Sequence, residues 1–524
     1  MKHILQHCKS SNLSIRARAR IFLIISIIKK ILARLIHSAR FFNFCSVAIL
    51  LFFASSILLA ISSYYTSPRL NLVEMSIATI YLVYYVRTAR FASRLKLPTM
   101  LFLYGALFHA VAFYWLTDTL IAFGKFTPTT AWIGFVAFCI ISGVQFFLCG
   151  LLYQFLEKTN FCKIAMISFP LAWCVTEWLY PRLFPWYLMN LHLSWSSFAT
   201  FVEYLPLPVL AGIFLWWLDV ILFGRRMAVI YTAVFSFAFC ILYGNIKNYY
   251  LLQGLERADT IRIALVQADA DSIIKRDPFV IERYKELTER LLESTTQPLD
   301  VIIWPESSVN FWLLTDTQNI RDTIVEGIGH YGVPLLFGGM TMERAPNDSP
   351  SVRALQNMLQ YNTVVGVNAD GSITGMYHKQ VLVPIGEYLP FEKYFKTLRR
   401  YSPETGSFDS GSLNMPIPIT IASNKTINFG ILICYEDLMP RLAREMTRNG
   451  ADVLVSFSND IWLRRDRALA QHTFLSMWRA VENKRYLLRV TNTGWTTVIN
   501  PLGEIVAELP LHQATTGVFE IKVH

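Results

Sequence analysis

The chain has 524 residues, of which 53% are hydrophobic, and its mean hydropathy is +0.38. These values exclude a wholly soluble protein and place part of the chain in lipid. Residues 1–246 carry 20 Lys and Arg against six Asp and Glu, whereas residues 247–524 carry 28 against 31. Because the basic excess is confined to the apolar half, it indicates membrane topology and contact with anionic lipid, and no nucleic-acid partner is expected.

Residues 1–40 are predicted to form a basic amphipathic leader on the cytoplasmic side. The leader contains no acidic residue, and its apolar stretch 21–36 is interrupted by Lys29, Lys30 and Arg34. Central charges favour a helix that lies on the inner surface over one that crosses the bilayer; a crossing would place the soluble half in the cytoplasm. A cleaved signal peptide is not expected, because no short uncharged apolar core precedes a small-residue cleavage site.

Residues 41–246 are predicted to form a transmembrane domain of about seven helices. A bilayer span requires roughly 20 mostly apolar residues. Seven stretches come close to this length, although the second and the fifth are short or interrupted: 44–64, 72–87, 98–118, 130–153, 163–180, 203–223 and 227–244.

The Lys and Arg residues at the ends of these stretches and between them predict the orientation, since cytoplasmic segments collect them. With the N-terminus inside, 17 fall on the inner side and three, Arg69, Lys125 and Arg182, on the outer side. Seven crossings then place everything after about residue 246 on the outer face. The few carboxylates of this half, such as Asp219, are expected near span ends, where snorkelling or structural pairing explains them better than a transport pathway.

Two aromatic loops, residues 114–117 and 184–187, are expected near the outer membrane interface. They have two interpretations: the mouth of a path for a lipid substrate, or part of the belt of aromatic rings that collects at membrane interfaces. The aromatic pattern is typical of both.

From residue 258 to residue 524 the pattern changes to short apolar runs that alternate with amphipathic stretches, which predicts an α/β sandwich. This domain is large enough to bury a core of its own. The runs at 261–267, 299–304, 333–337, 361–367, 373–378, 429–434 and 453–457 are predicted strands. The stretches 279–293, 316–331, 440–449 and 467–484 are predicted helices, and residues 368–371 form a hairpin turn.

Cys434 is the one cysteine of eight that lies in this hydrophilic half. It ends a short β-branched run and carboxylates follow it, at the place where α/β folds expose reactive groups. From position alone, a buried and inert thiol is the alternative. The cysteines form no CxxC pair and no metal-binding spacing with histidine, so neither a disulfide framework nor a metal site is expected.

Two other predicted strands end in polar residues that complete a chemical set, Glu306 and Lys379. A thiol with an unperturbed pKa of roughly 8.5 needs a base and a cationic neighbour to attack near neutral pH. Glu306 can accept the thiol proton, and Lys379 can lower the thiol pKa and neutralise an oxyanion. Taken singly, each has an ordinary structural explanation, as a surface or helix-capping glutamate and a solvated lysine.

Together these motifs resemble the Glu-Lys-Cys signature of the nitrilase superfamily. They are Trp304-Pro305-Glu306, Lys379 with Pro384-Ile385-Gly386-Glu387-Tyr388-Leu389-Pro390, and Ile433-Cys434-Tyr435-Glu436. The three reactive positions have spacings of 73 and 55 residues. A nitrilase-like domain behind a multi-span membrane half is similar to the apolipoprotein N-acyltransferase family. Residues 184–186, 265–267, 361–363, 456–460, 462 and 471–472 carry further likeness, so that the resemblance covers nearly the whole chain.

The resemblance implies an αββα catalytic domain on the periplasmic side of a bacterial inner membrane, with neither cofactor nor metal. Its implied catalytic residues are Glu306, Lys379 and Cys434. Glu387 is expected to orient Lys379, with a structural ion pair as the alternative. The further residues with an implied supporting or substrate-binding role are Tyr388, Tyr435, Glu436 and Trp462.

The implied reaction is a ping-pong transfer of an acyl chain. The acyl group passes from a membrane phospholipid to a thioester on Cys434 and then to the α-amine of the S-diacylglyceryl cysteine of an apolipoprotein. Residues 386–411, rich in aromatic side chains, suit a mobile apolar lid over this site. Two rival functions are a membrane-tethered nitrilase-type amidase and a non-catalytic nitrilase-like scaffold. No particular oligomeric state is predicted.

Three features depart from the family pattern. A last transmembrane helix usually follows the catalytic domain, whereas here the strand-like stretch 517–523 leads to His524, so the C-terminus is expected outside. Arg276 stands where tryptophan is frequent, and Leu463-Arg464-Arg465-Asp466 replaces an aromatic, a glycine and a polar residue after Trp462. These departures leave the triad intact and fall where lipid or acceptor preference is expected to differ.

Overall fold

The computed structural model describes residues 44–62, 68–89, 96–122, 124–193, 195–270, 279–315, 330–344, 358–392, 394–400, 406–413 and 415–523. The predicted leader, Arg276 and nearly all of the predicted helix 316–331 lie outside these residues. The chain divides into two compact units, residues 1–55 and 56–524. The first unit contributes the beginning of helix α2 to the described residues, and everything below concerns the second.

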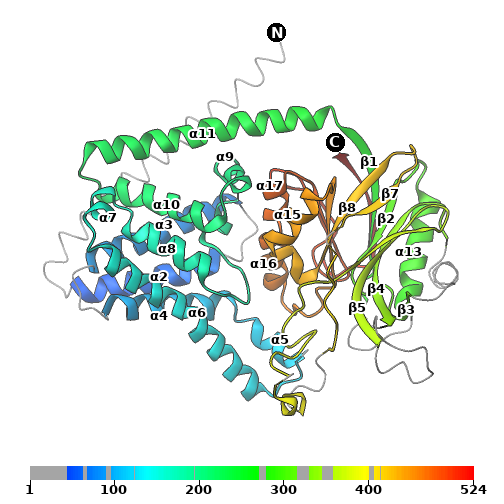
Figure 1. Ribbon diagram of the computed structural model, residues 1–524, viewed down its shortest axis with the longest axis horizontal. Coiled ribbons are helices and arrows are strands. Elements are labelled where there is room, and N and C mark those ends of the chain that lie inside the picture. The colour runs from blue at the N-terminus through cyan, green and yellow to red at the C-terminus, as the bar shows by residue number, and fades with distance from the viewer. Residues whose placement is uncertain are drawn as a thin grey trace, which may run out of the picture. The chain divides into compact units, whose positions relative to one another are not determined.

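The N-terminal half is helical, and each of the seven predicted apolar stretches contains a helix (Figure 1). By length and apolarity, α6 and α11 qualify as membrane spans within the described residues, and α4 with α5, bent by 55°, form a third candidate. The domain of seven spans therefore stays a prediction. The elements are α2 (Phe44–Ser62), α3 (Pro68–Thr88), α4 (Lys96–Ala112), α5 (Leu116–Ala122), α6 (Pro128–Leu156), α7 (Asn160–Ala165), α8 (Ser168–Leu179), η2 (Leu188–His192), α9 (Ser196–Ala199), η3 (Thr200–Glu203), α10 (Leu207–Phe223) and α11 (Met227–Glu256).

Small residues and the buried ion pairs of Arg87 with Asp219 and Glu157 hold this helical bundle together. A Cβ on Gly150 of α6 would lie 2.7 Å from the Cα of Pro98 at the start of α4, so glycine lets these two helices approach closely. Arg87 of α3 forms a two-pronged pair with the fully buried Asp219 of α10. Asp219 thus has the structural pairing expected for it, because a buried carboxylate requires a cationic partner.

Helix α11 connects the helical half directly to the C-terminal α/β half. It has 30 residues, against the 18 of the predicted stretch 227–244, and at about 1.5 Å per residue it is roughly 45 Å long. This exceeds the ~30 Å apolar core of a bilayer. Strand β1 begins at Asp259, three positions after the helix ends at Glu256, so the connection is short.

The C-terminal half contains two β-sheets that pack face to face (Figure 1). In the described residues the first has the order β13-β1-β2-β4-β5-β6 with β3 paired to β4, and the second β12-β11-β10-β9-β8-β7. The central strands of each sheet run parallel to one another: β1, β2 and β4 in the first, and β8, β9 and β10 in the second. Their carboxyl ends therefore lie at the same edge of the sheet. The strands are β1 (Asp259–Gln267), β2 (Val301–Trp304), β3 (Trp312–Leu314), β4 (Leu335–Arg344), β5 (Met358–Val367), β6 (Ile373–His378), β7 (Ile417–Thr420), β8 (Thr426–Ile433), β9 (Val453–Ser458), β10 (Leu487–Thr491), β11 (Thr497–Ile499), β12 (Ile505–Glu508) and β13 (Thr515–Val523).

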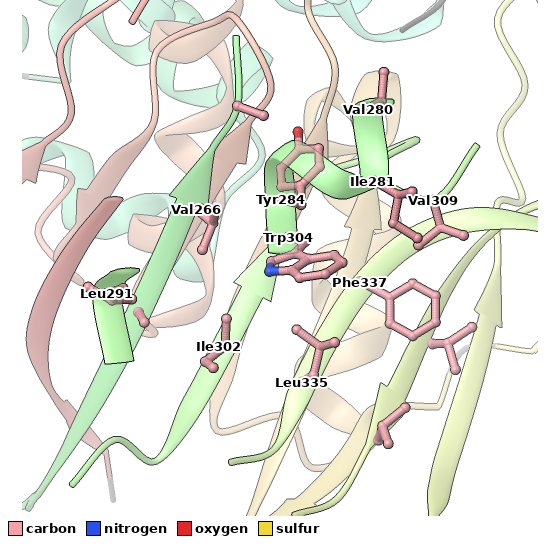
Figure 2. Packing of buried hydrophobic residues seen from close by; sticks show 14 of the residues in the cluster. Val266, Val280, Ile281, Tyr284, Leu291, Ile302, Trp304, Val309, Leu335 and Phe337 are labelled. Atoms are coloured by element: carbon pink, nitrogen blue, oxygen red, sulfur yellow. The ribbon is translucent and has the colours of Figure 1, made fainter. Parts of the chain in front are cut away.

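Helices cover the outer face of each sheet, which completes the predicted αββα sandwich. Helix α13 (Val280–Ser294) packs on the first sheet, and α15 (Pro440–Arg448) packs on β8 and β9 of the second. Figure 2 shows the core under α13, where Tyr284 stacks on Trp304 at a centroid distance of 5.4 Å. The indole N–H of Trp304 donates to Thr288 over 3.0 Å, so the last residue of β2 is held in place immediately before the Pro305-Glu306 turn.

The predicted strands and the hairpin turn are present, and β13 contains the strand-like stretch 517–523. The predicted helix 467–484 is two helices, α16 (Asp466–Ser476) and α17 (Trp478–Asn483), which meet at Met477. Strands β3, β7, β10, β11 and β12 were not predicted. In β10 the reason is visible, because the buried Arg489 interrupts its apolar run.

Candidate active site

Glu306 lies one residue beyond Pro305 at the end of β2, and it is buried. Its Oε1 accepts a hydrogen bond from the side-chain amide of Asn362 (2.7 Å), and its Oε2 accepts one from the backbone N–H of Asn459 (2.9 Å). The turn passes close to β4, where a Cβ on Gly338 would lie 2.6 Å from the Cα of Glu306. Both carboxylate oxygens are therefore fixed, and glycine is required beneath them.

Lys379 follows β6 directly and is 1% exposed. Its Nζ donates to Oε1 of Glu387 over 2.8 Å and lies 3.8 Å from Oε1 of Glu306. The amide of Asn362 also reaches Glu387, over 3.2 Å. The ammonium of Lys379 therefore donates its hydrogen bond to Glu387, and Glu306 lies nearby beyond hydrogen-bond distance.

Cys434 follows β8 and is buried, with a backbone φ of 52°. A non-glycine residue in this left-handed region is strained and persists only where its surroundings hold it. Glu436 supplies much of that hold. Its Oε2 accepts the backbone N–H of Ile433 (2.8 Å), and its Oε1 accepts those of Gln380 (2.6 Å) and Val381 (3.0 Å).

Glu436 therefore ties the nucleophile turn to the segment that follows Lys379. Its carboxylate also accepts the hydroxyl of Tyr377 (3.0 Å). Burial raises the pKa of Glu436 to about 7, against the opposing effect of the backbone N–H donors. The contacts give this residue a positioning role.

The charges of the three central residues act on one another. Burial raises the pKa of the Cys434 thiol, the charge of Glu306 raises it further and Lys379 lowers it, with a net rise. Burial also raises the pKa of Glu306, although Lys379 opposes the shift. Burial alone would lower the pKa of Lys379, but Glu387, Cys434 and Glu306 outweigh it and raise that pKa. The resting site is thus a protonated thiol beside a carboxyl group that can accept its proton and a permanent cation.

Aromatic residues of the helical half contact the residues around Cys434. The hydroxyl of Tyr435 donates to the backbone oxygen of Leu183, and its ring meets that of Phe184 edge to face at 6.3 Å. The ring of Trp462 lies 6.3 Å from that of Trp115. The two aromatic loops of the helical half therefore flank the site itself.

The stretch after Trp462, which departs from the family pattern, takes part in the same contact region. Arg465 pairs with Asp118 of α5 over 2.7 Å, and the hydroxyl of Thr119 donates to the backbone oxygen of Trp462 over 3.0 Å. Leu463 is buried. These residues lie against the helical half, whereas Arg276 is outside the described residues.

Tyr388 and the stretch around it are exposed. Tyr388 is 38% exposed, and Phe391, Tyr394 and Phe395 are 61–77% exposed. Glu392 and Arg399 pair within this stretch over 2.5 Å. Its described residues therefore present large apolar rings outward beside the active site.

Sequence reasoning missed the functional significance of several buried polar residues. In the sequence, Asn362 and Asn459 are part of the resemblance to the family and have no assigned role. The structure shows that both donate hydrogen bonds to the carboxylate of Glu306. Asp437 and Arg489 were not singled out, although a charged residue inside an apolar strand, as in β10, was a usable signal. Among the described residues, no group of three or more His, Cys, Asp and Glu side chains could hold a metal ion.

The fold and the site define a class of protein. The family model of the carbon-nitrogen hydrolases matches residues 262–524, which is half of the chain, and the chain belongs to that family. The model of the apolipoprotein N-acyltransferase N-terminal domain matches residues 57–208. Together the two matches place the chain in the apolipoprotein N-acyltransferase branch.

Individual relatives agree with this placement. The apolipoprotein N-acyltransferase of Geobacter metallireducens is 28% identical over 497 residues, which cover 88% of this chain and 86% of that protein. That of Caulobacter vibrioides is 29% identical over 406 residues, which cover 72% and 70%. Among solved structures, Saccharomyces cerevisiae Nit3, a member of branch 10 of the nitrilase superfamily, aligns with 50% of this chain and 90% of its own at 20% identity and a TM-score of 0.37.

Proposed function

We propose that this protein transfers an acyl chain from a membrane phospholipid to the α-amine of the S-diacylglyceryl cysteine of apolipoproteins, through a thioester on Cys434. The branch to which the chain belongs supports the reaction type. One observation of the structure supports the membrane substrate: loop residues Leu183 and Phe184 of the helical half contact Tyr435, the residue next to the nucleophile. A soluble amide would not require this contact.

The first half-reaction forms the thioester. Glu306 accepts the thiol proton while the sulfur of Cys434 attacks the ester carbonyl of the phospholipid, and Lys379 stabilises the oxyanion that forms. Glu306 then returns the proton to the glycerol oxygen as the C–O bond breaks. A lysophospholipid leaves, and the acyl group stays on sulfur.

The second half-reaction transfers the acyl group to the acceptor. The acceptor amine attacks the thioester carbonyl, Glu306 accepts a proton from the amine, and Lys379 again stabilises the oxyanion. When the C–S bond breaks, the proton passes to the departing sulfur. An amide forms on the acceptor, and Cys434 regains its thiol, so the cycle consumes no water and no co-reactant.

The thioester must be protected from water, since otherwise the enzyme would only hydrolyse phospholipid. We propose that the exposed rings of Phe391, Tyr394 and Phe395 form part of a lid in contact with lipid. Large apolar side chains exposed to water are unfavourable, so a cluster of them indicates a surface that contacts lipid or another partner. We also propose the predicted topology, in which seven spans of the bacterial inner membrane leave the catalytic domain in the periplasm.

The proposal is tested with purified protein and a phospholipid that carries a labelled acyl chain. We expect a hydroxylamine-sensitive label on Cys434, its absence in Cys434→Ala, and its movement to a diacylated lipopeptide added afterwards. An unlabelled wild type that also leaves the lipopeptide unmodified would refute acyl transfer.

The same preparation separates the rival functions. A nitrilase-type amidase would release ammonia from soluble amides without forming the lipid-derived label. A scaffold would do neither. The branch relationship favours the acyltransferase over both.

A further inference from the structure

Four charged side chains are buried together behind the nucleophile. They are Asp437 in η6 (Cys434–Leu438), Asp460 after β9, His472 in α16 and Arg489 in β10. None of the four is more than 6% exposed. Buried charges of this kind persist only where they are paired.

His472 is the centre of this cluster. Its Nε2 lies 2.9 Å from Oδ1 of Asp437, and its Nδ1 lies 3.1 Å from Oδ1 of Asp460. The charged imidazolium can donate to a carboxylate at both nitrogens at once, which the neutral ring cannot do. Burial opposes this charge, but Asp437 and Asp460 outweigh it and raise the pKa of His472 to about 9.

Arg489 completes the charge balance. Its Nη2 lies 2.8 Å from Oδ2 of Asp460 and 2.8 Å from Nδ1 of His472, and its Nε lies 3.5 Å from Oδ2 of Asp437. This contact brings two donors together, and its repulsion is offset because Asp437 and Asp460 each pair with both His472 and Arg489. Two positive and two negative charges leave the cluster neutral.

The cluster is connected to the nucleophile through the backbone. Asp437 and Cys434 belong to the same short helix, whose first residue has the strained φ of 52°. The hydroxyl of Ser456 in β9 donates to Asp437 over 2.7 Å, which anchors that helix to the sheet. The charges that face the thiol itself are Glu306, Glu387, Lys379, Asp460 and Arg489.

We propose that His472 is a positioning residue for the acyl transfer. Held as a cation between Asp437 and Asp460, it fixes the helix that carries Cys434 and cancels a negative charge behind the thiol. Fewer negative charges then oppose the positive charge of Lys379 where the thiolate and the oxyanion form. This inference rests on the proposed function for its place in the reaction, but it concerns the resting enzyme and can be tested without any lipid.

The test is the pH dependence of alkylation of Cys434 by iodoacetamide, measured on full-length protein by peptide mapping. A unit charge about 10 Å away at an effective dielectric of ~20 changes a pKa by roughly one unit. His472→Gln leaves an excess negative charge wherever His472 would be protonated, so the midpoint is expected to rise, by at most roughly one pH unit because His472 itself loses its proton near pH 9. Asp460→Asn removes a negative charge, so the midpoint is expected to fall. The double variant restores neutrality and should return towards the wild-type midpoint.

The matched controls are His330→Gln and Asp452→Asn. His330 contacts a hairpin carbonyl, and Asp452 caps the opposite end of β9, where it accepts the backbone N–H of Asn428 over 2.8 Å. Neither control is expected to move the midpoint.

A purely structural role for the cluster would slow alkylation at every pH and leave the midpoint in place. Movement of both single variants in the same direction, or of neither, overturns the proposal. If His472→Gln does not fold, Asp460→Asn and the double variant still decide, since their midpoints must differ. Because no acyl donor is present, failure of acyl transfer would leave this result unaffected.

Discussion

Glu387 determines which carboxylate Lys379 binds, and the variant Glu387→Gln tests this directly. In the structure the ammonium lies 2.8 Å from Glu387 and 3.8 Å from Glu306. Without the charge of Glu387, Lys379 is expected to move onto Glu306. Since the charge of Glu387 raises the pKa of Glu306 and that of Lys379 lowers it, both changes lower this pKa and weaken the base.

The cost to stability follows from the same contacts. Lys379 and Glu387 are 1% and 14% exposed at their side chains, so loss of one partner approaches the ~3–5 kcal/mol of a broken buried pair. Glu306 partly replaces that partner. In the wild type, the backbone N–H of Val383 donates to Glu387 over 2.8 Å. The side-chain amide of glutamine would place a donor opposite this N–H, so that hydrogen bond would be lost. We expect a loss of about 2–4 kcal/mol in the free energy of unfolding.

The assay is single-turnover formation of the labelled acyl-enzyme across pH, together with thermal unfolding. For Glu387→Gln we expect a 10- to 100-fold lower plateau, on the order of a lost acid-base contribution, and an acidic limb displaced to lower pH. Glu343→Gln is the control, since Glu343 pairs with the neighbouring His378 over 3.0 Å. An acidic limb that stays in place or moves to higher pH would show that Lys379 does not change partners.

Three further predictions concern other parts of the structure. Gly338→Ala should displace the general base Glu306, lower the acylation rate at least 10-fold and reduce the free energy of unfolding by about 1–3 kcal/mol. Gly339→Ala is the control, because its Cβ would lie 3.3 Å from its nearest neighbour, and both losses should be smaller. The pKa of His472 is raised to about 9, and this shift corresponds to about 3 kcal/mol of stability. That contribution is fully present below pH ~6.5 and is lost as the pH rises to about 9. The difference in Tm between wild type and His472→Gln should therefore shrink over that range. Arg87→Met leaves Asp219 buried and unpaired and should lower stability by about 3–5 kcal/mol, and Arg87→Met with Asp219→Leu should recover most of it; equal losses in both would contradict a structural pair.

Residues that act through local pattern were predictable from the sequence. The apolar run before Cys434 predicted β8, and the three polar strand ends predicted residues that the fold brings together. Tight spacing along the chain was not needed, because parallel strands bring their carboxyl ends to one edge of a sheet.

Residues that act through tertiary contacts were not predictable. The contacts of Asn362 and Asn459 with Glu306 join positions 56 and 153 residues apart. Nor could the pattern separate α16 from α17, because Met477 continues the helical periodicity and has a helical backbone, with φ −56° and ψ −27°. The buried Arg489 is intelligible only once Asp437 and Asp460 are seen beside it.

The short connection between α11 and β1 has a mechanical consequence. With Arg257 and Ala258 as the intervening residues, a flexible linker is excluded at this junction, and rotation of the helix must turn the first strand with it. If α11 crosses the bilayer, its tilt depends on membrane thickness, because a long apolar helix tilts more in a thinner membrane. Lipid composition would therefore adjust the height and the angle at which the reactive sulfur meets its acyl donor, and the enzyme would respond to the thickness of the membrane that feeds it.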